Sequence, residues 1–210
     1  MKSDKEAVPA RQRIMHAASE LFYKQGYRST GISDIIATAD VAKATFYAHF
    51  NSKEALCVEY LNEQNEAEKQ QILAAIAEAD TVYERFLAPA RLMEPFSAVG
   101  DQRGCRFLNM AAEIPQADNV LRKPGVDHYL ALREVLRDLT QELKESCSDS
   151  YGRLHVDAIA DSYLLLLTGG LITAELFDDL WPVRHIVFSV EQLVRPQQSS
   201  ASDIRSLEAV

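Results

Sequence analysis

The chain has 210 residues, of which 47% are hydrophobic, and a formal net charge of −9. This length allows one or two domains, and the hydrophobic fraction is sufficient for a packed core. The negative total disfavours nonspecific adherence to DNA, so charge alone does not indicate a nucleic-acid partner.

The residue pattern predicts an all-α fold. Only 8 Gly and 7 Pro interrupt the chain, and alternating runs of Val, Ile and Thr are nearly absent. We divide the chain into residues 1–52, residues 53–195 and a mobile tail at 196–210. The first part carries seven Lys or Arg and five Asp or Glu, a formal charge of +2, which leaves −11 for the rest. The small basic end can therefore still be steered to DNA.

The first predicted helix begins at Pro9 and ends at Gly26, residues suited to a helix start and a helix end. Its apolar stripe consists of Ile14, Ala17, Ala18, Leu21 and Phe22. Residues 31–50 then read as two short helices joined by a tight turn at Asp40. The second is expected to start at Val41 and to point Phe46 and Phe50 inward together.

The outward side of this second short helix is suited to contact with DNA. It carries one cation, small residues, two hydroxyls and an imidazole, namely Lys43, Ala44, Thr45, Tyr47 and His49. In a helix-turn-helix the second helix enters the major groove, and small side chains permit a close approach. We expect Tyr47 and His49 to bind phosphate, Lys43 and Thr45 to reach base edges, and Ala44 to touch a thymine methyl.

The head of the chain resembles the tetracycline-repressor (TetR) family of bacterial regulators over about residues 9 to 61. The resemblance rests above all on Thr45-Phe46-Tyr47-Ala48-His49-Phe50 followed by Lys53-Glu54-Ala55-Leu56. It implies a three-helix DNA-binding domain at 1–52, with its helix-turn-helix at 31–50, and a helical ligand-binding and dimerisation domain at 53–195. One departure is Asp40, where the family usually has Gly; Asp tolerates a left-handed backbone better than most residues.

Two further head positions match the family's contacts with the DNA backbone. Thr30 is one, and its alternative is a local hydrogen bond within a turn. Lys53 is the other. We expect Asn51 to cap the next helix and Glu54 to be its third residue, which places Lys53 in the first turn. A lysine there is unfavourable for the helix alone, because the helix N-terminus carries partial positive charge. A phosphate bound at that helix terminus would explain the lysine.

The body is predicted to contain several long helices. A first helix runs to about Ala79, and its polar middle, Asn62–Gln71, is expected to be a solvent-facing connector. Pro89 should kink or split the next helix. The remaining predicted segments are a helix at 81–95, a loop at 96–104, helices at 105–114 and 126–145, a loop at 147–152, a most buried helix at 154–177 and a last helix from Pro182.

The last two long helices carry more apolar surface than a monomer needs. By resemblance, they form a four-helix bundle across a two-fold axis, and the alternative is that they close the core of one chain. A homodimer predicts a palindromic double-stranded DNA operator with half-site centres about 34 Å apart. The apolar stretch 159–177 contains Asp161 and Glu175, so we expect no membrane span and a cytoplasmic protein.

The ligand site is the least defined prediction. The resemblance implies an unknown small-molecule effector, and aromatic or Met side chains of the body are candidates to line its cavity, although at helical spacing they are more often core: Phe86, Met93, Phe107, Met110, Tyr129 and Tyr163. Cys105 lies at a helix start beside Arg103 and Arg106, where a thiol could be partly ionised and sense oxidants; the alternative is a small buried residue.

No catalytic constellation, metal-ligand spacing or phosphate-binding glycine loop is visible, so we expect no enzyme activity, cofactor or metal. The sequence and the resemblance together predict a dimeric one-component regulator, most often a repressor, released from DNA by a small or reactive molecule. The alternatives are an activator of the same fold and a helical carrier or enzyme that retains a vestigial head.

Overall fold

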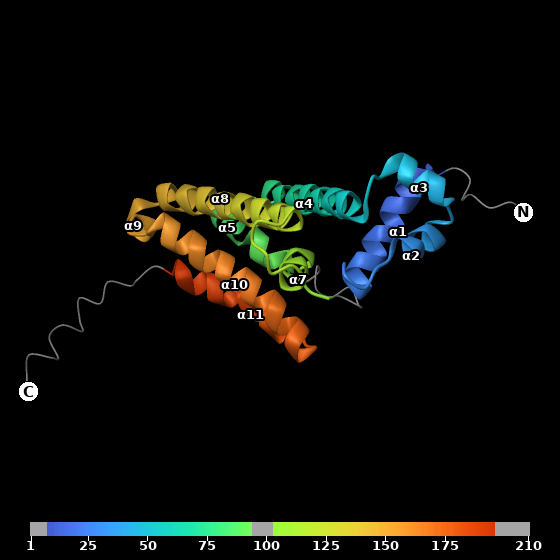
Figure 1. Cartoon of the computed structure of the whole chain (residues 1–210). Helices are drawn as coiled ribbons and strands as arrows, with labels where there is room; N and C mark the ends of the chain where they lie inside the picture. The colour runs from blue at the N-terminus through green and yellow to red at the C-terminus, as the bar shows by residue number, and fades with distance from the viewer. Residues whose placement is uncertain (1–7, 94–102, 196–210) are drawn as a thin grey trace, which may run out of the picture.

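The computed structural model describes residues 8–93 and 103–195, and within them it is helical without a strand, so the all-α prediction is confirmed (Figure 1). The elements are α1 (Ala10–Gln25), α2 (Ile32–Ala39), α3 (Lys43–His49), α4 (Lys53–Ala77), α5 (Val82–Arg91), α7 (Arg106–Glu113), the short 3₁₀ helix η2 (Val120–Arg122), α8 (Lys123–Ser146), α9 (Ser148–Tyr151), α10 (Val156–Phe177) and α11 (Trp181–Leu193). Most of the predicted loop at 96–104 and all of the predicted tail at 196–210 lie outside the described residues.

Helices α1–α3 form a head at one end of the molecule, and α4–α11 form an elongated body (Figure 1). The body has its own hydrophobic cluster, built by α5, α8, α10 and α11. A second cluster joins the head to the body, since Phe107, Met110, Ile114 and Leu121 share it with the apolar faces of α1–α3 and the start of α4. The head is therefore packed on the body by apolar contacts beyond the continuous α4.

The ends of the head helices follow the predicted signals closely. Gly26 ends α1 with a φ of +89°, in a region that favours glycine. Asp40 ends α2 in the left-handed conformation, with a φ of +51°, and Arg13 donates a hydrogen bond of 2.9 Å to its carbonyl. Helix α3 begins at Lys43 rather than at Val41, because the Val41 amide still closes the end of α2 by donating to the Ile36 carbonyl.

Several predicted caps and boundaries in the body are wrong by a few residues. Ser52, and not Asn51, caps α4, because its hydroxyl accepts the Ala55 amide at 2.9 Å. Asn119 caps η2, and α8 starts at Lys123 and not at residue 126, with a proline in its first turn, where proline is tolerated. The predicted loop at 147–152 contains the short helix α9.

Pro89 does not split α5, and a tyrosine from α10 binds the α5 backbone next to this proline. The Tyr163 hydroxyl accepts the Ala90 amide and donates to the Phe86 carbonyl, both at 3.0 Å. An undisturbed helix would join these two backbone groups directly, as residues i and i−4. Tyr163 is fully buried, so its hydroxyl provides hydrogen bonds that water cannot supply there.

The polar middle of α4 is not a solvent-facing connector on all sides. Asn65 lies 3.0 Å from His128 Nδ1 of α8, and Glu68 pairs with Arg106 of α7 at 3.5 Å. Burial raises the pKa of the Glu68 carboxyl, and the Arg106 guanidinium opposes that rise. The polar run on one helix therefore has polar partners on two others, which the pattern of α4 alone does not reveal.

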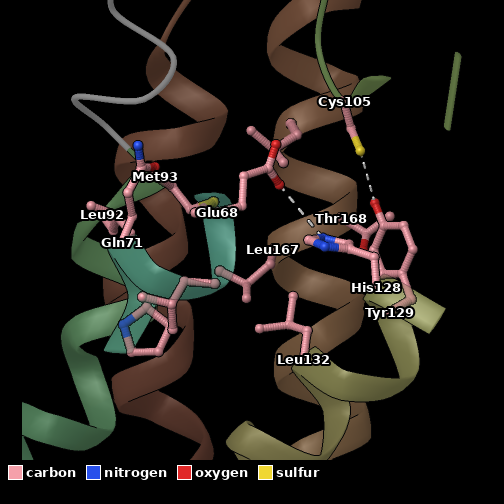
Figure 2. Close-up of a pocket in the computed structure, with 13 residues that line it drawn as sticks. Glu68, Gln71, Leu92, Met93, Cys105, His128, Tyr129, Leu132, Leu167 and Thr168 are labelled. Carbon is pink, nitrogen blue, oxygen red and sulfur yellow. Dashed lines mark hydrogen bonds and ion pairs between the residues drawn. The ribbon is translucent and has the colours of Figure 1, made fainter. Parts of the chain in front are cut away.

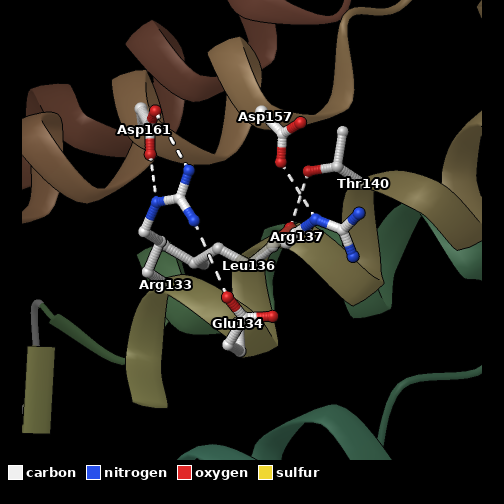
Figure 3. Close-up of polar contacts among 7 residues, drawn as sticks. All are labelled: Arg133, Glu134, Leu136, Arg137, Thr140, Asp157 and Asp161. Carbon is white, nitrogen blue, oxygen red and sulfur yellow. Dashed lines mark hydrogen bonds and ion pairs between the residues drawn. The ribbon is translucent and has the colours of Figure 1, made fainter. Parts of the chain in front are cut away.

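Helix α10 is not the most buried helix of the chain. Its inner side is buried at Ala160, Tyr163, Leu167 and Gly170, while its outer side and that of α11 expose large apolar residues: Leu165, Ile172, Leu176, Phe177, Trp181 and Phe188. Within the described residues, α10 has the length and composition of a membrane span, a weak indication that core helices also give. Figure 3 shows it instead joined to α8 by ion pairs, Arg133 with Asp161 and Arg137 with Asp157.

Candidate nucleic-acid interface and body pocket

Helix α3 presents most of the predicted contact residues on one exposed surface. Phe46 and Phe50 are buried beneath it, as predicted, and the Tyr47 ring stands edge-on to the Phe46 ring at 5.3 Å. The side chains above them are exposed, or half-buried in the case of Thr45: Lys43, Ala44, Thr45, Tyr47 and His49. A rigid inner face thus supports an outer face of hydrogen-bonding groups, the arrangement that a groove-binding helix needs.

An open hollow lies between α2 and α3. Lys43 and Tyr47 border it on one side, and Ile32, Ser33 and Ile36 on the other. The Asp40 side chain also borders it and is 98% exposed, so a carboxylate stands at this surface. Arg13 of α1 lies 4.0 Å from that carboxylate.

Thr30 and Lys53 do not fit their predicted contacts with DNA phosphates. Thr30 is fully buried, and its hydroxyl donates to the Gly26 carbonyl at 2.8 Å, so the alternative of a local turn hydrogen bond describes it. Lys53 Nζ donates to the carbonyls of Tyr27 and Thr30, both at 2.9 Å, and lies 4.2 Å from the centre of the Tyr27 ring. The ammonium is thus engaged by the α1–α2 loop, which accounts for a lysine at the start of α4.

A pocket opens in the body between α4, α5, α8 and α10 (Figure 2). Its walls are mostly apolar: Ile72, Pro89, Leu92, Met93, Leu132, Leu167 and Leu171. Of the six predicted lining residues, Met93 and Tyr129 line this pocket. The other four are core residues, Phe86 and Tyr163 in the body cluster, Phe107 and Met110 in the cluster shared with the head.

One end of the pocket is polar, and sequence reasoning missed it. Burial and the nearby Arg106 lower the pKa of His128 to about 4, so the imidazole is neutral at pH 7. Its Nδ1 lies 3.0 Å from the side-chain oxygen Oδ1 of Asn65, and a proton on Nδ1 would satisfy that oxygen and leave Nε2 as an acceptor. Nε2 lies 3.7 Å from Glu68 Oε2 (Figure 2), so two acceptors stand together at the pocket wall.

Cys105 also lines the pocket, but its environment does not favour a thiolate. Its sulfur accepts a hydrogen bond of 3.3 Å from the Tyr129 hydroxyl, and burial raises the pKa of the thiol. Arg103 donates to backbone carbonyls of α1, and Arg106 pairs with Glu68. The prediction of a partly ionised Cys105 is therefore wrong, because neither arginine is directed at the sulfur.

We expect iodoacetamide at neutral pH to alkylate Cys147 first, Cys105 more slowly and Cys57 last. Cys147 is exposed, and hydrogen bonding to Ser150 lowers the pKa of its thiol, whereas burial raises the pKa of both other thiols. The thiolate is the reactive form, so the order of alkylation follows the thiolate fraction and the exposure. Mass spectrometry of timed reactions checks this order, and alkylation of Cys105 before Cys147 would contradict it.

Within residues 8–93 and 103–195, no group of three His, Cys, Asp or Glu side chains is placed to hold a metal ion. The outer face of α3 offers hydrogen-bonding groups. The body pocket offers mostly apolar walls and, at one end, hydrogen-bond acceptors.

In sequence, the chain is similar to bacterial transcriptional regulators. A sequence model described as bacterial regulatory proteins of the tetR family matches residues 14–60. The transcriptional repressor DhaR of Mycobacterium sp. is 31% identical over 118 residues, which cover 55% of this chain and 57% of DhaR. The transcriptional regulator LmrA of Bacillus subtilis is 26% identical over 190 residues, or 89% of this chain and 97% of LmrA.

Solved structures of other regulators superpose on most of this chain. A TetR-family transcriptional regulator from Streptomyces coelicolor superposes with a TM-score of 0.81 at 26% identity, covering 88% of this chain and 94% of that protein. The reduced form of Escherichia coli NemR superposes with a TM-score of 0.78 at 21% identity, covering 89% and 98% of the two chains, and shows the shared fold.

Proposed function

We propose that this chain, whose head matches the sequence model of tetR-family bacterial regulatory proteins and whose fold matches that of TetR-family regulators, is a cytoplasmic one-component transcriptional repressor that binds a palindromic operator as a dimer. The observation that carries the proposal is the outer face of α3, where exposed hydrogen-bonding side chains stand on a buried Phe46 and Phe50. Lys43 and Thr45 are suited to base edges, and Ala44 to a thymine methyl. Tyr47 and His49 are suited to phosphate.

The exposed apolar residues of α10 and α11 support a homodimer. Leu165, Gly169, Ile172 and Leu176 follow helical spacing along the outer side of α10. A Cβ added at Gly169 would meet nothing within 4 Å, whereas Gly170 is packed against Ile186 of α11. Gly169 therefore faces the open side, where a second copy's helix could approach closely.

The body pocket supports release by a small molecule. Its apolar walls fit a predominantly apolar effector, and the acceptors Glu68 and His128 at its polar end fit a hydrogen-bond donor on that effector. For the effector to release DNA, it must bind the DNA-incompetent state more tightly, and by linkage the operator must weaken effector binding by the same factor.

Selection of bound duplexes from a random DNA pool, at a stated salt concentration, tests the proposal. We expect a palindrome to be enriched, with half-site centres about 34 Å apart. A folded dimer that enriches no sequence would contradict the repressor and favour the carrier or enzyme alternative.

The selected duplex then allows the α3 contacts to be separated. We expect Tyr47→Ala to weaken binding to all sequences by about the same factor, and Lys43→Ala to relax the preference at one base pair at a cost of about 1–3 kcal/mol. Lys69→Ala on α4, an exposed lysine of the body, is the control and should leave binding unchanged. If both α3 variants bind as the unchanged protein does, α3 is not the helix that reads the DNA.

A further inference from the structure

Helix α7 is attached to the head at both of its ends. At its beginning, the Tyr23 hydroxyl of α1 donates to the Gly104 carbonyl at 3.1 Å, and Arg103 donates to the Tyr23 carbonyl at 3.3 Å. At its end, Glu113 reaches the loop between α1 and α2. Figure 1 shows α7 at the end of the body that faces α1.

The Glu113 carboxylate binds two successive backbone amides of that loop. One oxygen accepts the Tyr27 N–H at 3.2 Å, and the other accepts the Arg28 N–H at 2.8 Å. Gly26 permits this approach, because a Cβ at that position would lie 2.4 Å from the carboxylate oxygen Oε1. Consecutive N–H groups that point at one anion form a specific binding arrangement, so the contact is more than a surface encounter.

The same loop is also held by Lys53 at the start of α4. Lys53 donates to the carbonyls of Tyr27 and Thr30, so the loop's carbonyls bind an ammonium while its amides bind a carboxylate. The loop continues directly into α2 at Ile32, and α2 leads into α3. Its position relative to the body therefore sets the position of the DNA-facing helix.

The beginning of α7 contacts the body pocket. Cys105 lines the pocket and accepts a hydrogen bond from Tyr129, and the Phe107 ring stacks on the His128 ring with 4.3 Å between centroids. His128 and Tyr129 line the same pocket. An eight-residue helix of about 12 Å thus connects side chains at the pocket with Glu113 at the head.

We infer that Glu113 is a positioning residue for operator binding, through which α7 transmits the state of the pocket to the α1–α2 loop and so to α3. This inference rests on the proposed repressor function. It adds a second route to the one through α4, because Glu113 holds loop amides that no α4 side chain is seen to hold in the described residues.

The first test is amide hydrogen exchange at Tyr27 and Arg28, measured by NMR without DNA. In Glu113→Gln the single amide oxygen can replace one of the two carboxylate bonds, so we expect exchange at one or both amides to become about tenfold faster. Glu142→Gln is the matched control: it removes a carboxylate that pairs with Arg85 inside the body, far along α8 from the head. Exchange at Leu139 reports global unfolding and should stay unchanged in both variants.

The second test asks whether the pocket acts on the loop through Glu113. Tyr129→Phe removes the hydrogen bond to Cys105, and Thr168→Leu adds bulk to the pocket wall. We expect either pocket variant to change the exchange of Tyr27 and Arg28 when Glu113 is present, to change it less when Glu113 is Gln, and to leave it unchanged when Glu113 is Ala, which removes both contacts. If Glu113 has only a structural role, the effects of the pocket variant and of Glu113→Gln on the exchange of Tyr27 and Arg28 will add. If α4 alone carries the signal, the pocket variant will have its full effect in the Glu113→Gln background. Either result overturns the inference.

The inference and the proposed function fail in different ways. Both exchange experiments need no DNA, so they test whether Glu113 couples the pocket to the α1–α2 loop even if no operator is selected from the pool. With a selected operator, Glu113→Gln should weaken binding at least about fivefold and Glu142→Gln should not, since couplings between sites are typically about 5- to 150-fold. Unchanged operator affinity in Glu113→Gln would overturn the positioning role while leaving the repressor assignment intact.

Discussion

Leu176→Glu is expected to convert the proposed dimer into monomers and to lower the affinity for a palindromic operator by about 100- to 1,000-fold. Leu176 is 75% exposed in a single chain and lies on the outer apolar side of α10. A glutamate buried there between two copies would lose its hydration without a partner. A single head would then bind each half-site alone, and the gain from linked binding, about 10²- to 10⁴-fold, would be lost.

Analytical ultracentrifugation and operator titration check this result together. Leu73→Glu is the matched control, because Leu73 is also an exposed leucine but lies on α4, outside the α10 and α11 face. It should leave both the dimer and the operator affinity unchanged. A Leu176→Glu protein that remains dimeric and binds as before would show that this face does not join the two copies.

Tyr163→Phe is expected to lower the free energy of unfolding by about 2–4 kcal/mol. The change deletes the hydroxyl that accepts the Ala90 amide and donates to the Phe86 carbonyl. Both groups are buried beside Pro89, and each unsatisfied buried group costs about 1–3 kcal/mol. The ring itself stays, so its packing against Phe86, at 5.3 Å between centroids, is retained.

Urea denaturation followed by circular dichroism measures the loss. Tyr47→Phe makes the same chemical change at an exposed position and should leave stability within about 0.5 kcal/mol of the unchanged protein. A Tyr163→Phe protein of unchanged stability would mean that the Ala90 amide and the Phe86 carbonyl bond each other directly once the hydroxyl is gone.

The head could be predicted from the sequence because its signals are local. Gly26 ends α1, Asp40 takes the left-handed turn conformation, and Phe46 and Phe50 point inward at a spacing of four. Each of these depends on a few neighbouring residues. The family motif spans the same stretch, so motif and local physics agree there.

The contacts between distant segments could not be predicted in the same way. Glu68 lies in a polar run that resembles a solvated helix face, yet its partners come from α7 and α8. Lys53 was assigned to phosphate because a first-turn lysine needs an anion or an acceptor, and the acceptors are carbonyls 23 and 26 residues earlier. Helical spacing alone does not tell a core aromatic such as Phe86 from a pocket residue such as Tyr129.

The α1–α2 loop is bound by both Glu113 and Lys53 of the body. These contacts limit how freely the head can be replaced by the head of another regulator. A hybrid regulator joined at residue 52 would place a foreign loop between Glu113 and Lys53. To make the same contacts, that loop would need a glycine at the position of Gly26, so that Glu113 can approach. It would also need two amides available to Glu113 and two carbonyls directed at Lys53. A transplanted head that lacks these features would keep its own sequence preference but lose its response to the new body, so α7 belongs to the unit that must be exchanged.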